Sequence, residues 1–551
     1  MNKIRSLEEV VELVRDGDTI TWSGCIGILN PERVLGALEA KFLTEGHPRD
    51  LTLFEPCSTV VSVGMEHFAY EGFIRRLITA HLGIDLEPDH CRMVVDNKIE
   101  AFAIPLGVAN QLLAEIARKS PGLLTKVGLH SYLDPRLQGG KYNDVTKGDL
   151  IRVVEFEGEE WLFLKSFPIN VAVIRGTTAD EDGNLSLEEE PLTLSVLYQA
   201  MAASNWGGKV IAQVKRVVPR GSLDPRMVVV PGVMVDAVVV VEDQWQHERF
   251  PGEYDPGIDG RARVAPPPAP LYPLDAEKVV ARRAAMELAA GQVVNLGAGI
   301  PTRRLAVFTL EEDIQDLITV SREHGALGGI SYGRDVHVNP TSWLCYQDVF
   351  NWYTGGGLDI SFSGFGQVNP DGDVNLTRFS KHVLRGPGGA ADIIHHAKKV
   401  VFTGAFTQGG LRVKIDRDKR CMVIVEEGRN LKFVNRLYHV TMSGKYLGSQ
   451  HKPVLFVTER AVFQLTQGGL ELIEIAPGID LQKDVLEKME FRPLISGSLR
   501  EMDSRVFSDG KMGLRRDMLG CEEPGRKPPV PLVPVEKLPE RSYWTSRTIK
   551  R

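Results

Sequence analysis

The apolar residues of this chain follow two spacings, one typical of helices and one typical of buried strands. Between Ser6 and Arg15 they recur at helical spacing, which predicts an amphipathic helix. Residues 19–22 form a short run of strand-forming residues, and Asn30 and Pro31 are the expected cap and first position of the next helix. A helix, a strand, a glycine-containing loop and a further helix make up the repeating unit of α/β folds.

Further short apolar runs predict the other strands of this α/β fold. These runs are residues 51–54, 93–96, 169–174, 210–217, 228–230 and 317–320. The alternation stops in a turn-rich stretch after Tyr254 and in a proline-rich run at residues 265–273, which can form neither a central strand nor a helix. We therefore expect an N-terminal domain at residues 1–255, a proline-rich linker at 256–275, a second domain at 276–520, and a tail rich in proline and charge at 521–551.

The second half of the chain repeats features of the first half in the same order. The matching segments are residues 17–31 with 291–301, 182–185 with 371–376, 209–212 with 399–402, and 231–233 with 477–479. Each match is short, and chance similarity among glycine-rich turns is the alternative. Because all the matches occur in one order, they favour a duplication, and we expect two homologous open α/β domains joined by the linker.

A candidate catalytic carboxylate follows the apolar run at residues 317–320. Glu323 follows this run directly, and Gly325, Gly328 and Gly329 come next. Open α/β sheets place their ligands at strand ends, and glycines let the backbone approach a ligand closely. A carboxylate at such a place can act as a nucleophile or transfer a proton. A surface glutamate in a glycine-rich turn is the alternative.

The composition is that of an ordinary globular protein, with 43% apolar and 25% charged residues. A net charge of −7 gives no general attraction for nucleic acid or for an anionic membrane. The first residues lack the apolar core of a signal peptide, and the most apolar stretch, residues 227–241, is too short to span a bilayer. The six cysteines form no CxxC pair, so we expect a reduced, cytoplasmic protein without a metal site.

Two other residues compete with Glu323 for a catalytic role. Glu55 also follows an apolar run, but Pro56 and Cys57 replace the glycines, so we interpret it as structural or pocket-lining. Cys25 lies in the first glycine loop, but no histidine and aspartate pair can be assigned to it, which favours a small packed side chain over a reactive thiol. The 297–299 segment lacks the third glycine of a dinucleotide fingerprint, which argues against NAD binding.

Several segments, taken together and in this order, resemble class I coenzyme A transferases. They are residues 30–39, 48–53, 95–101, 105–108, 121–128, 323–329, 356–364 and 386–389. The resemblance runs from about residue 4 to about residue 519. It is strongest to the single-chain type that includes propionate and acetate CoA-transferases, and succinyl-CoA:3-ketoacid CoA-transferase is a more distant relative.

The resemblance implies that Glu323 is the nucleophile of a ping-pong reaction. Its carboxylate attacks an acyl-CoA to give an anhydride, and the CoA thiolate returns to form a glutamyl–CoA thioester. The resemblance also implies backbone N–H donors for the oxyanion and for CoA, which we assign to two segments. These segments contribute Cys25, Ile26 and Gly27 from the first half, and Gly386, Gly388 and Gly389 from the second. The pocket is then expected between the two halves.

Further residues are expected to line or brace the substrate pocket. They are Leu106, Gly107, Gln111, Asp359 and Asn375. Leu106 stands where many relatives have glutamine, which favours a more apolar acyl pocket. Turn or cap roles for Asp359 and Asn375, and an exposed helical position for Gln111, are the alternatives.

His324 stands where relatives often carry a small or amide residue. It could influence the ionisation of Glu323, although a hydrogen-bonded structural histidine is the favoured interpretation.

The resemblance predicts an enzyme of short-chain fatty acid or ketone body metabolism. It would transfer CoA from a short- or medium-chain acyl-CoA to a small carboxylate such as acetate. CoA would be a substrate, no metal or nucleotide cofactor is expected, and a homodimer or homotetramer is implied. An acyl-CoA hydrolase on the same fold and a non-catalytic ligand-binding protein are the alternatives.

Overall fold

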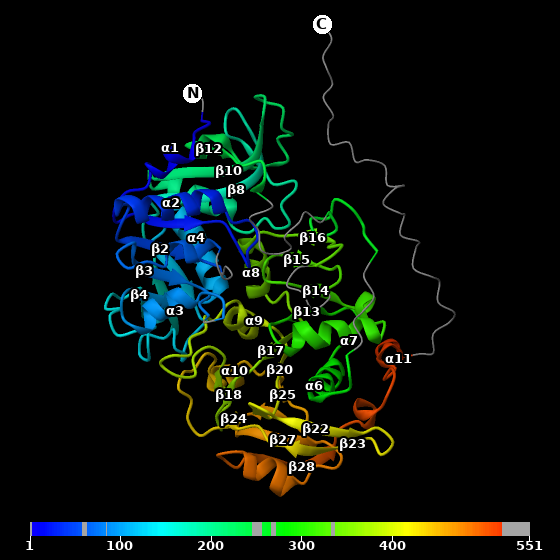
Figure 1. Ribbon diagram of the computed structural model, residues 1–551. Helices are drawn as coiled ribbons and strands as arrows, with labels where there is room; N and C mark the ends of the chain where they lie inside the picture. The colour runs from blue at the N-terminus through cyan, green and yellow to red at the C-terminus, as the bar shows by residue number, and fades with distance from the viewer. Residues whose placement is uncertain are drawn as a thin grey trace.

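The computed structural model describes residues 3–57, 63–83, 85–244, 256–265, 272–331 and 337–520. These residues form an α/β fold built around two large sheets, one from each half of the chain (Figure 1). In Figure 1 the first half runs from blue to blue-green and the second from green to red. The tail at 521–551 and most of the proline run, residues 266–271, lie outside the described residues.

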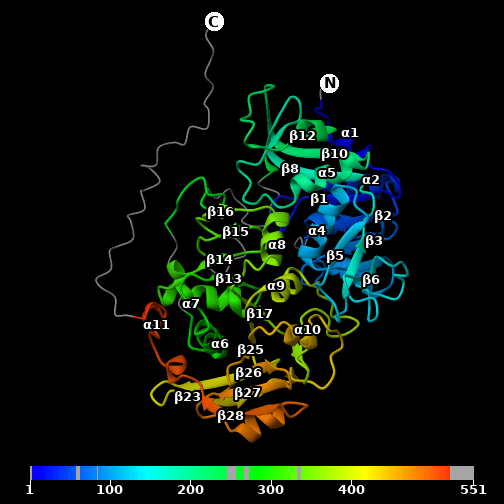
Figure 2. The ribbon, with the colours of Figure 1, turned by 180° about the vertical axis from the view of Figure 1, so that it is seen from behind.

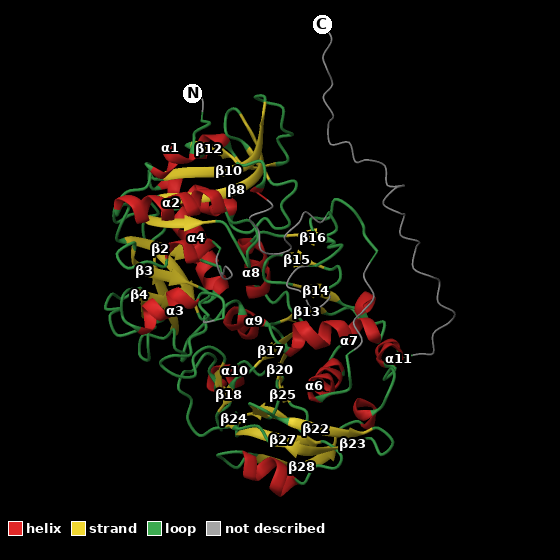
Figure 3. Cartoon of the chain, in the orientation of Figure 1, coloured by secondary structure: helices red, strands yellow, loops and turns green. Residues whose placement is uncertain are grey.

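The first half contains a main sheet, a small antiparallel sheet and helices on both sides (Figure 3). Its strands are β1 (Thr19–Trp22), β2 (Leu51–Glu55), β3 (Ile74–Thr79), β4 (Glu100–Ala103), β5 (Gly122–Thr125), β6 (Ile151–Phe156), β7 (Glu159–Lys165), β8 (Val171–Asp180), β9 (Leu185–Ser186), β10 (Lys209–Val218), β11 (Val228–Val230) and β12 (Ala237–Val240). Its helices are α1 (Leu7–Val11), α2 (Glu32–Glu45), α3 (Pro88–Val95), α4 (Leu106–Ala117) and α5 (Val196–Asn205), with short helical segments η1 (Gly64–Phe68) and η2 (Gly232–Met234).

The second half contains a mixed sheet and several small hairpins. Its strands are β13 (Val293–Leu296), β14 (Thr319–Ser321), β15 (Ala326–Leu327), β16 (Ser342–Trp343), β17 (Ile360–Gly364), β18 (Gln367–Val368), β19 (Val374–Asn375), β20 (Val400–Thr403), β21 (Thr407–Gln408), β22 (Arg412–Asp416), β23 (Cys421–Glu426), β24 (Asn430–Leu431), β25 (Val454–Val457), β26 (Ala461–Thr466), β27 (Gly469–Ile475) and β28 (Leu494–Glu501). Its helices are α6 (Ala276–Ala285), α7 (Ala306–Glu311), α8 (Tyr346–Thr354), α9 (Ala390–His396), α10 (Gly444–Ser449) and α11 (Leu514–Leu519), with short segments η4 (Pro301–Leu305), η5 (Gln315–Leu317), η6 (Leu481–Val485), η7 (Leu486–Lys488) and η8 (Ser504–Phe507).

The two main sheets share one strand order. In the first half, parallel strands stand in the order β2-β1-β8-β10-β12, and in the second half in the order β14-β13-β17-β20-β25. Carboxyl ends of neighbouring parallel strands meet at one edge of a sheet. Each half therefore has an edge at which the carboxyl ends of its parallel strands meet, and β2 and β14 hold equivalent places.

The parallel strands are buried on both faces of their sheets, which explains why their sequences are continuous apolar runs. Every position of β8 is buried, because helices cover both sides of a parallel sheet. Helix α5 packs on β8 and β10, while α6 and α9 pack on the second sheet. Seen from behind, α8 and α9 of the second half lie beside α4 of the first (Figure 2), and both contact α4.

Most of the predicted elements form, but two local predictions are wrong. Residues 93–96, expected as a strand, include the last turn of α3, because His90, Cys91, Met93 and Val94 are buried at helical spacing. Helix α2 begins at Glu32, so Pro31 precedes the helix and Asn30 gives it no side-chain cap. Among the described residues, no helix combines the length and the apolar character needed to cross a lipid bilayer.

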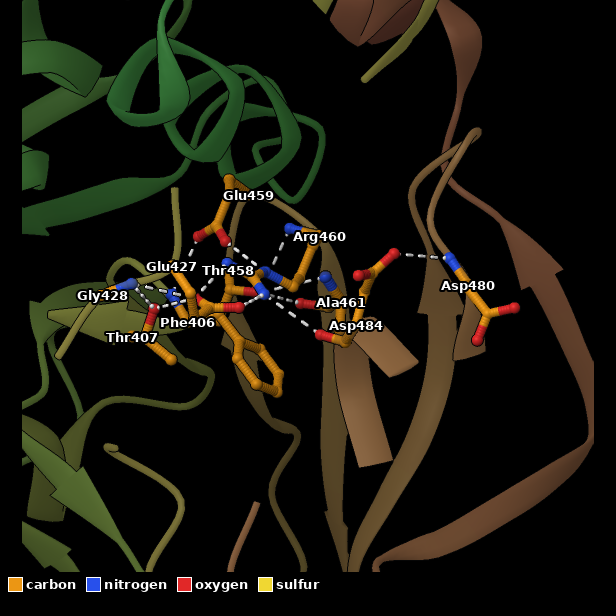
Figure 4. Close-up of polar contacts among 10 residues, drawn as sticks. All are labelled: Phe406, Thr407, Glu427, Gly428, Thr458, Glu459, Arg460, Ala461, Asp480 and Asp484. Carbon is orange, nitrogen blue, oxygen red and sulfur yellow. Dashed lines mark hydrogen bonds and ion pairs between the residues drawn. The ribbon is translucent and has the colours of Figure 1, made fainter. Parts of the chain in front are cut away.

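A buried ionic cluster stabilises the end of β25 in the second half (Figure 4). The side chains of Glu459 and Arg460 are fully buried, and Arg460 Nε donates to Glu459 Oε1 at 2.6 Å. Two further Arg460 nitrogens bind the carboxylate of Glu427, at 2.8 and 3.0 Å. Burial raises the pKa of Glu427, but hydrogen bonds from Arg460 and Thr407 outweigh it and lower that pKa below its usual value.

Removal of the Arg460 guanidinium should lower the free energy of unfolding. We expect Arg460→Met to lower the free energy of unfolding by about 3–5 kcal/mol, because it leaves buried carboxylates without their partner. Arg412→Met, which breaks the exposed pair of Arg412 with Glu426, should cost less than about 1 kcal/mol. Denaturant unfolding checks both values, and equal costs would contradict the prediction. Because the pKa of Glu427 is lowered in the fold, the effect of Arg460→Met should shrink as the pH falls below about 4.5.

Candidate active site

Glu323 lies in a tight turn at the carboxyl end of β14. The turn is closed by hydrogen bonds from the Arg322 N–H to the Ala326 carbonyl and from the Gly325 N–H to the Arg322 carbonyl, both 2.9 Å long. Gly325 has a φ of 103°, and a Cβ there would stand 1.9 Å from the Leu344 carbonyl oxygen, so only glycine fits. The structure thus confirms a strand followed by a glycine turn that presents Glu323 at the edge of the sheet.

The carboxylate of Glu323 is partly shielded and not fully paired. Its Oε2 atom is buried, and no hydrogen-bond partner for it exists among the described residues. A Cβ built on Gly389 would lie 3.4 Å from Cβ and 3.5 Å from Cγ of Glu323, so Gly389 borders the side chain directly. A buried, unpaired carboxylate oxygen costs free energy, and such costs are typical of reactive groups that await a substrate.

Tyr353 of α8 lies on another side of Glu323. Its hydroxyl is 2.6 Å from the Ser321 hydroxyl, at the end of the strand that carries Glu323. Burial raises the pKa of Tyr353, and the charge of Glu323 adds to this rise. Tyr353 is therefore a neutral hydroxyl close to the carboxylate.

The glycine segment 386–389 joins the second half to the first. The Gly386 N–H donates to the Leu82 carbonyl at 2.5 Å, and the Gly388 N–H donates to the Ala80 carbonyl at 2.9 Å. A Cβ on Gly386 would stand 2.5 Å from His81 Cα, so glycine is needed for this approach. The expected oxyanion role is thus corrected for Gly386 and Gly388, because their N–H groups already have acceptors. Gly389, beside Glu323, stays a candidate.

Asp392 of α9 caps helix α4 across the two halves. Its two carboxylate oxygens accept the N–H groups of Gly107 at 2.9 Å and Val108 at 3.0 Å, in the first turn of α4. Leu106 donates its own N–H to the Gly388 carbonyl at 2.9 Å. Burial raises the pKa of Asp392 to about 7, while the two N–H bonds oppose this rise. Leu106 and Gly107 therefore lie in the contact between the halves, close to the glycine segment.

The first glycine loop reaches the other end of α8. Cys25 and Ile28 exchange backbone hydrogen bonds around Ile26 and Gly27, whose φ values are 47° and 80°. The Tyr346 hydroxyl donates to Cys25 Sγ at 3.0 Å. Tyr346 begins α8 and precedes Tyr353 by seven residues, which corresponds to roughly 10 Å of helix. The loop and Glu323 thus border one helix at different ends, and the Cys25 thiol serves as a packed acceptor.

Asp359 does not belong to the site. It directly precedes β17, and its carboxylate accepts the Val293 N–H and the Lys398 ammonium, each at 2.8 Å. Because β13, β14 and β17 are parallel, this is the amino edge of the sheet, opposite to Glu323. The expected pocket role of Asp359 is therefore wrong, since the sequence shows a carboxylate near a strand but not which end it occupies.

Asn375 and Gln111 form their hydrogen bonds with residues other than Glu323. Asn375 is fully buried, and its amide bonds the backbone of Arg378, which makes it the brace of a turn. Gln111 donates to Thr354 Oγ1 at 3.2 Å and lines a hollow of about 360 Å³ between the halves. Glu323 is not among the residues that line this hollow.

Glu55 holds the equivalent place at the end of β2, but its surroundings differ. Its side chain is 1% exposed, and Oε1 accepts the Cys57 N–H at 3.0 Å. Burial raises the pKa of Glu55 well above its usual value, and the nearby Cys57 adds to the rise. A neutral, enclosed acid is a poor nucleophile, so the structural interpretation of Glu55 is favoured.

The loop after β13, residues 297–300, lies at the same edge of the sheet as Glu323. It follows the strand next to β14 and opens η4, and Gly299 has a φ of 96° with open space where a Cβ would stand. No acceptors for the N–H groups of Ala298 and Gly299 exist among the described residues. Free N–H groups at the start of a helical segment favour anions.

Comparisons with known proteins agree with this geometry. The family model for coenzyme A transferase matches residues 4–241. A caffeate CoA-transferase of Acetobacterium woodii is 40% identical, over 93% of this chain and 99% of that protein. The crystal structure of the apoenzyme of the acyl-CoA transferase YdiF from Escherichia coli O157:H7 is 37% identical, with a TM-score of 0.88 over 93% of this chain and 97% of that one. A thioester complex of that enzyme with CoA has a TM-score of 0.86.

The cap on α4 yields a prediction about stability. We expect Asp392→Ala to lower the free energy of unfolding by about 3 kcal/mol, because two buried N–H groups lose their acceptors. The same change at Asp480, an exposed cap of η6, should cost about 1 kcal/mol. Asp392→Asn, which keeps one acceptor oxygen, should lie between wild type and Asp392→Ala. Chemical denaturation checks the order, and a cost at Asp392 no larger than at Asp480 would refute it.

Proposed function

The chain belongs to the coenzyme A transferase family, and from this premise we propose that it passes CoA from an acyl-CoA to a free carboxylate through a covalent intermediate on Glu323. The observation that carries the role of Glu323 is its buried, unpaired Oε2 atom in a glycine turn at the edge of the second sheet. Glu55, at the equivalent edge of the first sheet, also has an unpaired Oε2 atom, but its side chain is fully enclosed, whereas Glu323 is only partly buried. Burial raises the pKa of Glu55 well above its usual value, so Glu55 is a neutral acid.

The proposed reaction passes through two covalent intermediates on Glu323, an anhydride and a thioester. One oxygen of Glu323 attacks the thioester carbonyl, the C–S bond breaks, and the electron pair leaves with the CoA thiolate, so an acyl–glutamyl anhydride remains. The thiolate then attacks the glutamyl carbonyl, and the first carboxylate departs from a glutamyl–CoA thioester. A second carboxylate attacks this thioester, and the same steps run in reverse. The covalent intermediate preserves the transfer potential that hydrolysis would waste.

Each attack generates an oxyanion that needs hydrogen-bond donors. We assign this role to the N–H groups of Ala298 and Gly299, which follow the strand next to Glu323 and have no acceptors among the described residues. Gly389 borders the Glu323 side chain and is a further candidate. The Cys25–Gly27 loop lies at the other end of α8, so it fits contact with a more distant part of CoA.

The substrates that we propose are a short- or medium-chain acyl-CoA and a small carboxylate such as acetate. Support comes from Leu106, which is buried and apolar at the contact between the halves. The relatives include an acetate CoA-transferase and a caffeate CoA-transferase, which act on different carboxylic acids. Neither a metal nor a nucleotide cofactor is needed in this scheme, because the carboxylate is itself the nucleophile.

Two further features belong to the proposal, the oligomeric state by resemblance and the location from the cysteines. A homodimer or homotetramer is expected, and a cytoplasmic location is supported by the free thiols of the five cysteines that the structure describes.

Substitution of the nucleophile tests the mechanism. Glu323→Ala should lower the rate of transfer by at least about 1,000-fold, because no carboxylate remains to hold the acyl group. Incubation of the wild-type enzyme with acyl-CoA and borohydride should change the mass of the peptide that carries Glu323. Glu55→Gln is the matched control and should keep most of the activity. Near-normal turnover of Glu323→Ala, or an adduct on Cys25 instead, would refute the assignment.

A screen of acyl-CoA donors against carboxylate acceptors, with water as the control acceptor, tests the transferase reaction. We expect transfer to a small carboxylate to exceed hydrolysis by at least about 100-fold, because the intermediate must outlast its exposure to water. Equal consumption of acyl-CoA with and without any carboxylate would identify a hydrolase on the same fold. Mass spectrometry of the acyl-CoA products provides the measurement.

A further inference from the structure

His81 belongs to the first half but lies beside the glycines that border Glu323. It follows β3 at the carboxyl edge of the first sheet, between Ala80 and Leu82, which are fully buried. Because neighbouring residues of an extended chain point to opposite sides, the His81 ring points away from that core, and its side chain is 31% exposed.

Two consecutive glycines separate His81 from the nucleophile. A Cβ on Gly388 would lie 3.7 Å from His81 Cδ2, and a Cβ on Gly389 would lie 3.4 Å from Glu323 Cβ. Consecutive Cα atoms stand about 3.8 Å apart, so the two side chains are separated by a distance on the order of 10 Å. A carboxylate between them, with a contact of about 3 Å at each of its oxygens, can bridge a distance of this order.

The Nδ1 side of the His81 ring is buried beside an acidic side chain. Its Nδ1 atom is buried and lies 3.9 Å from Oε2 of Glu87, a fully buried carboxylate that also accepts the Gly83 N–H at 2.9 Å. The exposed part of the ring is therefore its outer edge, which leaves Nε2 as the nitrogen that a ligand can reach. The cation next to this contact, Arg385, is paired with Asp85 at 2.8 Å.

We propose that His81 Nε2–H binds the carboxylate of the free acid, both as it leaves and as its replacement enters. This inference rests on the proposed reaction at Glu323. One oxygen of the incoming carboxylate must attack the glutamyl–CoA thioester, and its other oxygen needs a donor that fixes the attacking geometry. A histidine N–H from the opposite half supplies it, and a charge-assisted hydrogen bond of this kind is strong. His81 is thus a residue that determines specificity for carboxylate acceptors.

This role acts only on the free acid. In the acyl-CoA and in the glutamyl–CoA thioester, no free substrate carboxylate exists for His81 to bind. Loss of the imidazole should therefore raise the Michaelis constant for the acceptor carboxylate. Because release of the first acid is the reverse of this step, the glutamyl–CoA adduct should form more slowly but to the same final extent. A merely structural residue would instead change both the Michaelis constant and the final extent, or neither.

The experiment compares His81→Ala, His81→Gln and the control His47→Gln in the full-length enzyme. His47 is an exposed histidine that contacts Asp16 at the opposite edge of the first sheet. We expect His81→Ala to raise the Michaelis constant for acetate by about 10- to 100-fold. His81→Gln, whose amide can still donate, should recover part of the loss, and His47→Gln should behave as wild type. The final extent of adduct formation with acyl-CoA alone should match wild type in all three.

Three results would count against the proposal. An unchanged Michaelis constant for acetate in His81→Ala overturns it, and so does loss of the adduct in a folded His81→Gln variant, because His81 would then act on Glu323. If the wild-type enzyme itself forms no adduct on Glu323, the proposed reaction fails first, and this outcome is distinct from the other two. Thermal unfolding of each variant shows whether it is folded.

Discussion

The structure depends on a carboxylate buried at the start of a helix from the other half of the chain. Asp392 satisfies two N–H groups in the first turn of α4, and the positive end of the helix dipole favours its ionised form against the cost of burial. Because α9, which carries Asp392, begins directly after Gly389, this cap fixes the glycine segment against Leu106 and the 80–82 edge. Gly389 then borders Glu323. One hydrogen-bonded acid therefore determines how the nucleophile meets the first half.

Duplication explains the plan of the molecule, and the differences between the copies explain where the chemistry occurs. Both halves place a glutamate at the carboxyl end of an equivalent strand, β2 or β14. In the first copy, burial makes Glu55 a neutral acid. In the second, a glycine turn leaves Glu323 only partly buried, beside Gly389. Equivalent residues thus differ in function because their surroundings set their charge and their access.

The sequence predicts the features that depend on neighbouring residues and fails where distant segments meet. Strand β14, its glycine turn and Glu323 follow from a local apolar run and from residue types that tolerate positive φ. The cap of α4 cannot be predicted in this way, because Asp392 and Gly107 are 285 residues apart. Asp359 lies at the amino edge of the sheet and not at the edge of Glu323, which the spacing of apolar residues and the composition do not reveal. The apolar run at residues 93–96 is too short for its spacing to distinguish a strand from a helix.

The way in which the halves are joined matters for catalysis. The segments around Ala80 and Gly388 meet mainly through backbone hydrogen bonds, which glycine makes possible by removing side chains from the contact. Such bonds order no long side chains and respond little to salt, unlike surface ion pairs. A displacement of about 1 Å can cost 100-fold in rate, so a site shared between two halves needs a contact of this kind. Backbone pairing at the junction is therefore a requirement of the chemistry as much as of the fold.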